Sequence, residues 1–319
     1  MGESVEIAIG ERTLRLTNLD KALYPTGFTK SEIIEYYARV APVMIPHLAG
    51  RCITLKRFPD GSGKGGFFEK RCPPHRPDWV DVAEGPGDRL GGVYYCRLEE
   101  PAALVWTANL AALELHAPMA LADDLAAPRA IVFDFDPGAP AGIRECCEVA
   151  LAVREVLAVA KLEGYVKTSG SKGMQLYVPL NTLARAKHTP THEDASDFAL
   201  AVAKVVERQL PGRTTTVMAK AQRPGKIFID YSQNAFHKTT IAPYSLRARD
   251  EPTASTPVTW DEVEAGAVGD LELRFEADAV LARVEADGDH FADVLTTRQT
   301  IPSTSAMRTR SLPSRRSAP

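Results

Sequence analysis

The alternation of hydrophobic and polar residues predicts strands and helices in turn along this chain. Residues 6–16 alternate with a period of two on both sides of Gly10, which predicts a short β-hairpin. The sequence Thr-Lys-Ser-Glu at 29–32 has the pattern of a helix-capping box. Apolar residues continue after it at helical spacing, so we expect a helix that ends at Pro46.

The strongest pattern lies in the middle of the chain, at 131–138. Its apolar residues carry Asp134 and Asp136 at alternate positions, so both carboxylates are expected on one face of a strand. A helix is predicted after Pro140 up to about Lys161. The remaining predicted elements are a strand at 165–168, a small-residue turn at 169–173, a strand up to Pro179, a helix at 191–210 and a strand at 225–231. This order predicts a mixed α/β protein.

The paired aspartates are candidates for metal ligands. Two neighbouring carboxylates repel one another unless a cation lies between them, and their oxygen atoms suit Mg²⁺ or Mn²⁺. Asp230 ends a later strand and offers a third carboxylate to a two-metal site. The alternative is a strand-end turn in which the aspartates only cap the following helix. The turn at 169–173 offers N–H groups to a phosphate, although small-residue turns of this kind also occur without a ligand.

Composition places the chain among globular proteins. Its 319 residues are 45% hydrophobic, contain no apolar run of about 18 residues and begin without an apolar leader, so we expect a cytoplasmic protein without membrane segments. The five cysteines are an odd number, which argues against a disulfide framework and fits a reducing compartment. Cys72 and His75 have the spacing of half a zinc site, but no second pair completes it.

The net charge of −3 excludes a uniformly positive surface, so any nucleic-acid binding must rest on local basic patches. One patch is the glycine-rich, lysine-containing loop at 59–66, which Phe67 and Phe68 follow directly. These paired aromatics are either a platform on which a base stacks or part of the hydrophobic core. From Ser303 the chain is rich in Ser, Thr, Pro and Arg and is expected to form a disordered basic tail.

Taken together, the motifs resemble the polymerase domain of bacterial non-homologous end-joining ligase D, within the archaeo-eukaryotic primase superfamily. The resemblance runs from about Asn18 to Trp260 and rests on the order and spacing of short motifs. These motifs are Leu-Thr-Asn-Leu-Asp-Lys21, Phe-Phe-Glu-Lys70, Pro-Asp-Trp79, Glu-Leu-His116, Phe-Asp-Phe-Asp-Pro-Gly138, Ser-Gly-Ser-Lys-Gly173, Ile-Asp-Tyr-Ser-Gln-Asn234 and Thr-Ile-Ala-Pro-Tyr-Ser-Leu-Arg247.

The resemblance implies a primase-like fold, with a central catalytic sheet flanked by helices and a smaller N-terminal αβ module. We expect that module at about 1–120, the catalytic core at about 121–302 and the tail at 303–319. It also implies roles for single residues. Asp134, Asp136 and Asp230 would be catalytic and would bind two divalent cations, Mn²⁺ or Mg²⁺. The nucleotide contacts would be Lys56, His116, Ser169, Lys172, Gln175, Lys238 and Arg247. Asn18, Lys21 and Lys30 would bind a DNA 5'-phosphate, and Phe67 and Phe68 would stack beneath the template strand.

The implied activity is template-dependent addition of nucleotides, with a preference for NTPs over dNTPs, to primer 3'-ends at DNA gaps and breaks. The implied partners are DNA with gaps or double-strand breaks that bears a 5'-phosphate, the nucleotide, Ku and a separate DNA ligase. No membrane is involved, and the protein is expected at the nucleoid. The chain lacks the Lys-x-Asp-Gly nucleophile of a covalent ligase, so we expect a free-standing polymerase.

One departure from the family pattern is that Met174 and Gln175 stand where the family has Leu-His. We expect weaker triphosphate binding, because an amide lacks the charge that an imidazolium carries. Two other functions share part of this pattern. A haloacid-dehalogenase-like phosphatase also starts with Asp-x-Asp, but Pro137 and Gly138 do not fit its continuation. A DNA-end-binding scaffold with weakened catalysis would fit Gln175, but all three aspartates are present.

Overall fold

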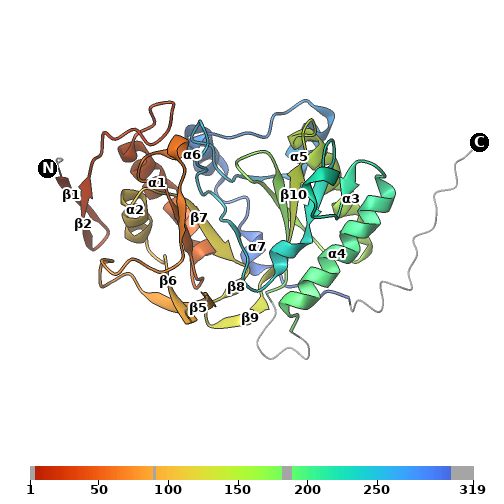
Figure 1. Cartoon of the computed structure of the whole chain (residues 1–319), viewed down its shortest axis with the longest axis horizontal. Coiled ribbons are helices and arrows are strands. Elements are labelled where there is room, and N and C mark those ends of the chain that lie inside the picture. Colours follow the sequence, from red (N-terminus) through yellow and green to blue (C-terminus); the bar gives the residue numbers. More distant parts are fainter. Residues whose placement is uncertain (1–3, 89–90, 182–188, 303–319) are drawn as a thin grey trace, which may run out of the picture.

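The computed structural model describes residues 4–88, 91–181 and 189–302, and the expected tail at 303–319 lies outside them. Two α/β lobes lie side by side, each with its own sheet (Figure 1). The first lobe begins with the predicted hairpin, followed by two helices that pack together. These elements are β1 (Ser4–Ile9), β2 (Arg12–Thr17), α1 (Lys30–Leu48) and α2 (Pro101–Asn109).

The first lobe contains an antiparallel sheet of four strands, which supplies one side of the candidate site. In spatial order the strands are β15 (Thr239–Ile241), β7 (Ala112–Pro118), β3 (Thr54–Arg57) and β4 (Phe67–Glu69). Two small hairpins complete this side of the molecule. They are β5 (Val82–Asp88) with β6 (Gly91–Cys96), and β8 (Ala120–Leu121) with β9 (Asp124–Pro128).

The second lobe is built on a six-stranded sheet. Its strands, in spatial order, are β13 (Thr214–Thr215), β14 (Ile227–Asp230), β10 (Ala130–Pro137), β12 (Met174–Pro179), β11 (Tyr165–Thr168) and β16 (Pro257–Val258). Three helices pack into the same core: α3 (Ile143–Val159), α4 (His192–Gln209) and α5 (Trp260–Val268). Phe133 and Phe135 of β10 are fully buried in this core, so the helices cover the sheet face opposite the aspartates.

The last helices are α6 (Ala277–Asp287) and α7 (Asp293–Thr296). α6 returns to the first lobe, where Val280 and Leu281 pack into the same core as α1. The two cores therefore do not divide the chain at a single point, and the expected division near residue 120 stays a prediction. The mixed α/β fold with a flanked central sheet is confirmed.

Helix α1 starts as predicted but ends later. The side-chain oxygen of Thr29 accepts the Glu32 N–H, and the Glu32 carboxylate accepts the Thr29 N–H, as in a capping box. The prediction that the helix ends at Pro46 is wrong, because the helix continues to Leu48. Proline has a helical φ and loses only its own N–H bond, and burial of an apolar face that ends in Leu48 maintains the last turn.

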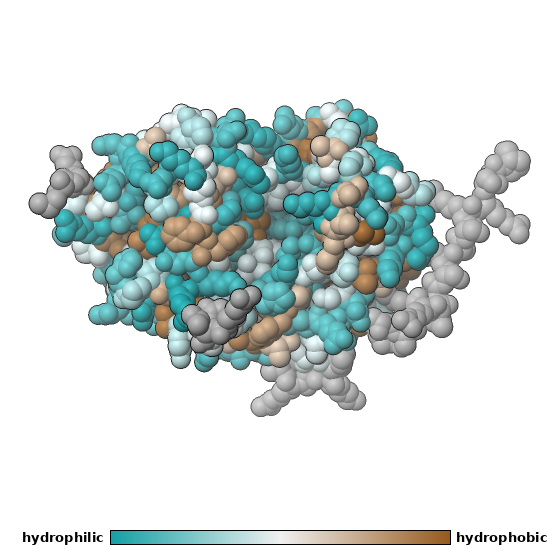
Figure 2. Space-filling view, in the orientation of Figure 1, coloured by the Kyte–Doolittle hydropathy of each residue, from teal (hydrophilic) through white to brown (hydrophobic). Residues whose placement is uncertain are grey.

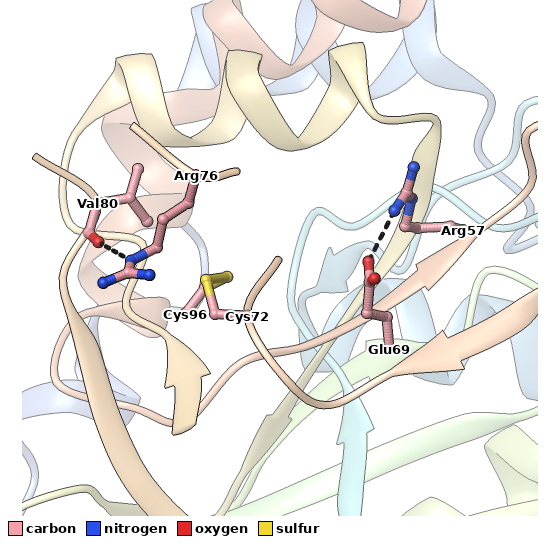
Figure 3. The surroundings of a disulfide bond; sticks show 6 residues. All are labelled: Arg57, Glu69, Cys72, Arg76, Val80 and Cys96. Carbon is pink, nitrogen blue, oxygen red and sulfur yellow. Dashed lines mark hydrogen bonds and ion pairs between the residues drawn. A yellow bond between two sulfur atoms is a disulfide. The ribbon is translucent and has the colours of Figure 1, made fainter. Parts of the chain in front are cut away.

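The odd number of cysteines argues against a disulfide framework, but it did not reveal the disulfide that Cys72 and Cys96 form, with Cα atoms 4.8 Å apart (Figure 3). The two residues are 24 positions apart in the sequence, and the Cys72 N–H donates to the carbonyl of Tyr94, which brings the loop after β4 against β6. Counting cysteines does not reveal such a pairing, because it depends on tertiary structure. Cys72 is therefore not half of a zinc site, and the other cysteines are buried thiols.

The surface is mostly hydrophilic, with hydrophobic residues in small separate groups on the face seen in Figure 2. Within the described residues, no helix is long and apolar enough to cross a membrane.

Candidate active site

Strand β10 presents its two aspartates on the sheet face that the helices leave uncovered. Asp134 is partly buried and Asp136 is exposed. Strand β14 runs antiparallel to β10 and places Asp230 directly opposite Asp134. The alternating pattern of the sequence thus brings three carboxylates together on neighbouring strands.

The carboxylates concentrate negative charge. Burial and the nearby charge of Asp136 raise the pKa of Asp134 to about 7. Burial and the charge of Asp230 likewise raise the pKa of Asp136. A guanidinium nitrogen of Arg223 lies 3.9 Å from Asp136 and offsets part of this charge. Oxygen donors with excess negative charge are the donor set that a hard divalent cation requires.

The carboxylate of Asp230 is oriented by hydrogen bonds from the residues that follow it. Its carboxylate accepts the Ser232 N–H at 2.9 Å, the Ser232 hydroxyl at 2.6 Å and the Gln233 amide at 3.0 Å. Among residues 4–88, 91–181 and 189–302, no three Asp, Glu, His or Cys side chains are already arranged around one metal position. Asp230 accepts two of these bonds on Oδ1 and only one on Oδ2, so a lone pair of Oδ2 remains for a cation beside Asp134 and Asp136.

The side chain of Gln175 is held by a buried lysine, Lys167. Gln175 lies on β12 opposite Asp134 of β10, and Lys167 lies on β11 opposite Gln175. The Lys167 ammonium donates to the Gln175 side-chain oxygen at 2.7 Å, to the Ser255 hydroxyl at 2.7 Å and to the Ile241 carbonyl at 3.0 Å. Because Lys167 occupies the amide oxygen, the amide NH₂ is left for Asp134, where its hydrogen bond favours the ionised carboxylate. Weaker triphosphate binding through Gln175 stays a prediction.

The predicted phosphate turn is tighter than the sequence suggested. The Ser169 hydroxyl oxygen accepts the N–H groups of Ser171 at 3.3 Å and Gly173 at 3.2 Å, so these donors are already used. Gly170 has a φ of 66°, and a Cβ there would lie 2.5 Å from the Ala254 backbone, so only glycine fits. In addition to any backbone N–H that is not used in this way, the turn offers a phosphate the Ser169 hydroxyl hydrogen and the exposed Lys172 ammonium.

A pocket of about 410 Å³ lies between the two sheets. It is polar and is lined by residues from both lobes. From the second lobe come Asp134, Asp136, Pro137, Ser169, Ser171, Lys172, Gly173, Gln175, Arg223 and Gln233; the other lining residues are His116, Thr239, Thr240, Ile241, Arg247 and Arg249. Asp230 is not among the lining residues but lies beside Asp134 through the strand pairing.

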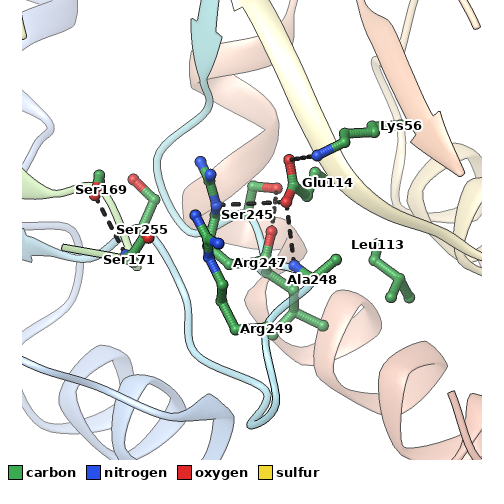
Figure 4. Close-up of polar contacts among 12 residues, drawn as sticks. Lys56, Leu113, Glu114, Ser169, Ser171, Ser245, Arg247, Ala248, Arg249 and Ser255 are labelled. Atoms are coloured by element: carbon green, nitrogen blue, oxygen red, sulfur yellow. Dashed lines mark hydrogen bonds and ion pairs between the residues drawn. The ribbon is translucent and has the colours of Figure 1, made fainter. Parts of the chain in front are cut away.

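Two of the expected nucleotide contacts do not line this pocket. Lys238 directly precedes the lining residue Thr239. Lys56 lies on β3 and joins the site through Glu114, with which Arg247 also forms an ion pair (Figure 4). Lys56 therefore lies beside the pocket, next to the cations that line it.

Phe67 and Phe68 are not core residues, since 48% and 58% of their surface is exposed. They lie on β4 opposite Arg57 and Lys56 of β3, and each cation lies over the ring of its partner. The Phe68 ring also meets the His116 ring edge-on at 5.3 Å. The exposed aromatic pair is thus continuous with the pocket, and the core interpretation is wrong.

Backbone bonds bring together Asn18, Lys21 and Lys30. The Lys21 N–H donates to the Asn18 carbonyl and the Lys30 N–H donates to the Lys21 carbonyl. Lys21 is exposed and lies 3.8 Å from Asp60. Lys30 is buried, and its ammonium donates to the Thr17 carbonyl at 2.7 Å. The three residues expected to bind a 5'-phosphate therefore form one local cluster.

Sequence reasoning missed Glu114 and Lys167, which contact the expected site residues. Each is a charged residue inside a short apolar strand, and this exception to the pattern was the available signal.

The chain is similar to several curated proteins. It is 42% identical over 283 residues to the multifunctional non-homologous end joining protein LigD of Mycolicibacterium smegmatis, which covers 88% of this chain and 36% of that protein. It is 32% identical over 282 residues to the bifunctional non-homologous end joining protein LigD of Bacillus subtilis, covering 88% of this chain and 44% of that one. The chain thus spans less than half the length of these relatives.

A solved structure and a family model agree with this likeness. The polymerase domain from Mycobacterium tuberculosis ligase D, in complex with DNA, superposes with a TM-score of 0.80 at 39% identity, over 90% of this chain and 99% of that one. The model of the LigD primase-polymerase domain matches residues 29–291. With the strand-borne aspartates and the two-lobed fold, these matches confirm the family expected from the motifs: the chain belongs to the LigD primase-polymerase domains.

Proposed function

We propose that the protein is a nucleotidyltransferase that adds nucleotides, with template guidance, to primer 3'-ends at DNA gaps and double-strand breaks during non-homologous end joining. One observation carries the proposal. The pocket is lined both by the carboxylates Asp134 and Asp136 and by the cations Lys172, Arg247 and Arg249, and a metal-bound triphosphate needs both kinds of group. Membership of the LigD primase-polymerase family supports the assignment.

The proposed reaction is attack of the primer 3'-hydroxyl on the α-phosphate of the nucleotide. Asp134 and Asp136, joined by Asp230, would bind the divalent cations. When bound, such cations lower the pKa of the attacking hydroxyl and stabilise the charge that develops at phosphorus and on the leaving pyrophosphate. The residues of this chain hold the triphosphate through Ser169, Lys172 and Arg247.

We propose that the DNA binds to the surface beside the pocket. Phe67 and Phe68 are exposed aromatics on which the template bases can stack. Asn18, Lys21 and Lys30 form a cationic cluster for the 5'-phosphate at the far side of the gap. The preference for NTPs, cooperation with Ku and a separate ligase, and a place in the cytoplasm at the nucleoid rest on the resemblance and are proposed with the activity.

The experiment is extension of a labelled primer on gapped DNA that bears a 5'-phosphate, with each NTP and dNTP, in Mn²⁺, in Mg²⁺ and in EDTA. We expect templated extension that needs the metal and is faster with NTPs. Binding of the DNA without extension in either metal would reject the polymerase and favour the DNA-end-binding scaffold instead.

A further inference from the structure

Glu114 lies on β7 with 1% of its surface exposed, and four donors converge on it. One carboxylate oxygen accepts from the Lys56 ammonium at 3.3 Å and from His116 Nε2 at 2.9 Å. The other accepts the Ala248 N–H at 3.1 Å and faces Arg247 Nε at 3.5 Å (Figure 4). These donors come from three separate segments: β3, β7 and the loop after β15.

These partners stabilise the ionised form of Glu114. Burial alone would raise its pKa, but the hydrogen bond from His116 and the charges of Arg247 and Lys56 outweigh burial and lower the pKa to about 2. Glu114 is therefore ionised throughout the neutral pH range. Its single negative charge faces two permanent cations, so the cluster keeps an excess of positive charge beside the pocket.

The geometry leaves most of the donors free for a ligand. An ammonium has three N–H groups and a guanidinium has five, and Glu114 occupies only one direction of each. Because a carboxylate only accepts, His116 Nε2 must carry a proton, which fixes the tautomer of the ring. Arg247 and His116 line the pocket, whereas Glu114 does not.

We propose that Glu114 is a positioning residue, which holds Lys56 and Arg247 in the arrangement that receives the triphosphate end of the incoming nucleotide and fixes the ring of His116 beside them. The inference rests on the proposed function and deepens it by naming the residue that organises the nucleotide-binding cations. Glu114 touches none of the reacting atoms and acts only through the three side chains that it holds.

The direction in which nucleotide affinity changes distinguishes a positioning role of Glu114 from the simple effect of its negative charge. Replacing Glu114 by glutamine removes one negative charge next to a site for a polyanion. By Coulomb's law alone, this change tightens the binding of the nucleotide. If Glu114 acts by orienting its partners, the same change weakens binding, because an NH₂ group takes the place of one carboxylate oxygen and cannot accept from the cations that this oxygen held.

The test compares Glu114→Gln with the wild type in primer extension with ATP, and in ATP titration calorimetry without primer. We expect KM and the dissociation constant to rise about tenfold, as the loss of one oriented charge-assisted contact implies. We expect kcat to change by less than about threefold, because interactions lost equally from ground and transition states alter KM alone. An unchanged or lower KM and dissociation constant in the folded variant would overturn the inference.

The chain offers a matched control in Asp289, a partly buried carboxylate that also accepts several hydrogen bonds. It accepts from His47 Nε2 at 2.8 Å, the Tyr244 hydroxyl at 2.5 Å and the Phe291 N–H at 2.8 Å, away from the pocket. Asp289→Asn is expected to lower the unfolding temperature and to leave the KM for ATP unchanged. If Asp289→Asn raised the KM as much as Glu114→Gln, general loss of stability would explain both and the inference would fail.

A measurement on the wild type covers the case in which Glu114→Gln does not fold. The ¹⁵N signals of the His116 ring, assigned by their loss in His116→Gln, are expected to show the neutral tautomer with the proton on Nε2. A proton on Nδ1 would overturn the inference.

Primer extension distinguishes a failure of the proposed function from a failure of this inference. If the wild type extends no primer, the proposed function is rejected. If the wild type extends the primer and Glu114→Gln has the same KM, only the role of Glu114 is rejected.

Discussion

Lys30 differs from an ordinary surface lysine because its ammonium is buried next to a backbone carbonyl. Burial lowers its pKa to about 8, and the charges of Lys21 and Arg57 contribute in the same direction. The Lys30 ammonium donates to the Thr17 carbonyl at 2.7 Å and to the Thr17 hydroxyl at 3.5 Å, which leaves one N–H for a ligand. At neutral pH the group is charged, and a rise in pH through and above 8 removes the charge while a terminal phosphate stays doubly negative.

This gives a pH-dependent prediction for DNA binding. Gapped DNA with a 5'-phosphate is expected to bind more tightly than unphosphorylated DNA at pH 7, by about 1–3 kcal/mol for one or two charge-assisted contacts. The difference is expected to shrink between pH 7.5 and about 9.5, because only protonated Lys30 attracts the phosphate. Fluorescence anisotropy at fixed salt measures both affinities.

Lys30→Arg is the matched variant, since a guanidinium stays charged over this range and should keep the discrimination at high pH. Lys204→Ala, on the exposed side of α4, should change nothing. Equal binding of the two DNAs at pH 7, or discrimination in the wild type that does not vary with pH, would remove Lys30 from the 5'-phosphate site.

At the scale of elements, the aromatic strand β4 is cross-linked to its neighbours at its C-terminal end. On the strand itself, Glu69 pairs with Arg57 of β3 at 2.9 Å (Figure 3). Just beyond it, the disulfide between Cys72 and Cys96 joins the chain to β6. A strand of three residues has few backbone bonds of its own, so these cross-links are what keep the exposed phenylalanines in a fixed position.

The disulfide makes a direct prediction about thiols. Denatured protein without reductant should contain three titratable thiols, from Cys52, Cys146 and Cys147, and five after reduction. Reduction should lower the free energy of unfolding by about 3 kcal/mol, as expected for a loop of this length. Urea unfolding with and without reductant measures the change.

The double variant Cys72→Ala/Cys96→Ala is the control. It should have the lower stability of the reduced protein and should no longer respond to the reductant. Five thiols in the protein as purified without reductant would contradict the cross-link.

For the whole molecule, the sequence pattern predicted the elements better than it predicted their contacts. The strand with Asp134 and Asp136 and its helices were predictable because periodicity is a local property. The family motifs added the primase-like fold. The disulfide and the partners of Glu114 and Lys167 were not predictable, because each joins segments that only tertiary structure brings together. The extension of α1 past Pro46 depends in the same way on the core that it packs against.

The central claim is that the carboxylates of β10 and β14 perform metal-dependent nucleotide addition. The measurement that tests it most directly is primer extension by Asp134→Ala, Asp136→Ala and Asp230→Ala beside binding of the same gapped DNA, with the exposed Asp261→Ala as control. Each site variant should lose about a hundredfold or more in extension and bind DNA as the wild type does, because metal ligands act on the reaction rather than on docking. Asp261→Ala should retain both properties. Near-normal extension by any one of the three site variants would contradict the account for that aspartate, and near-normal extension by all three would contradict the active site.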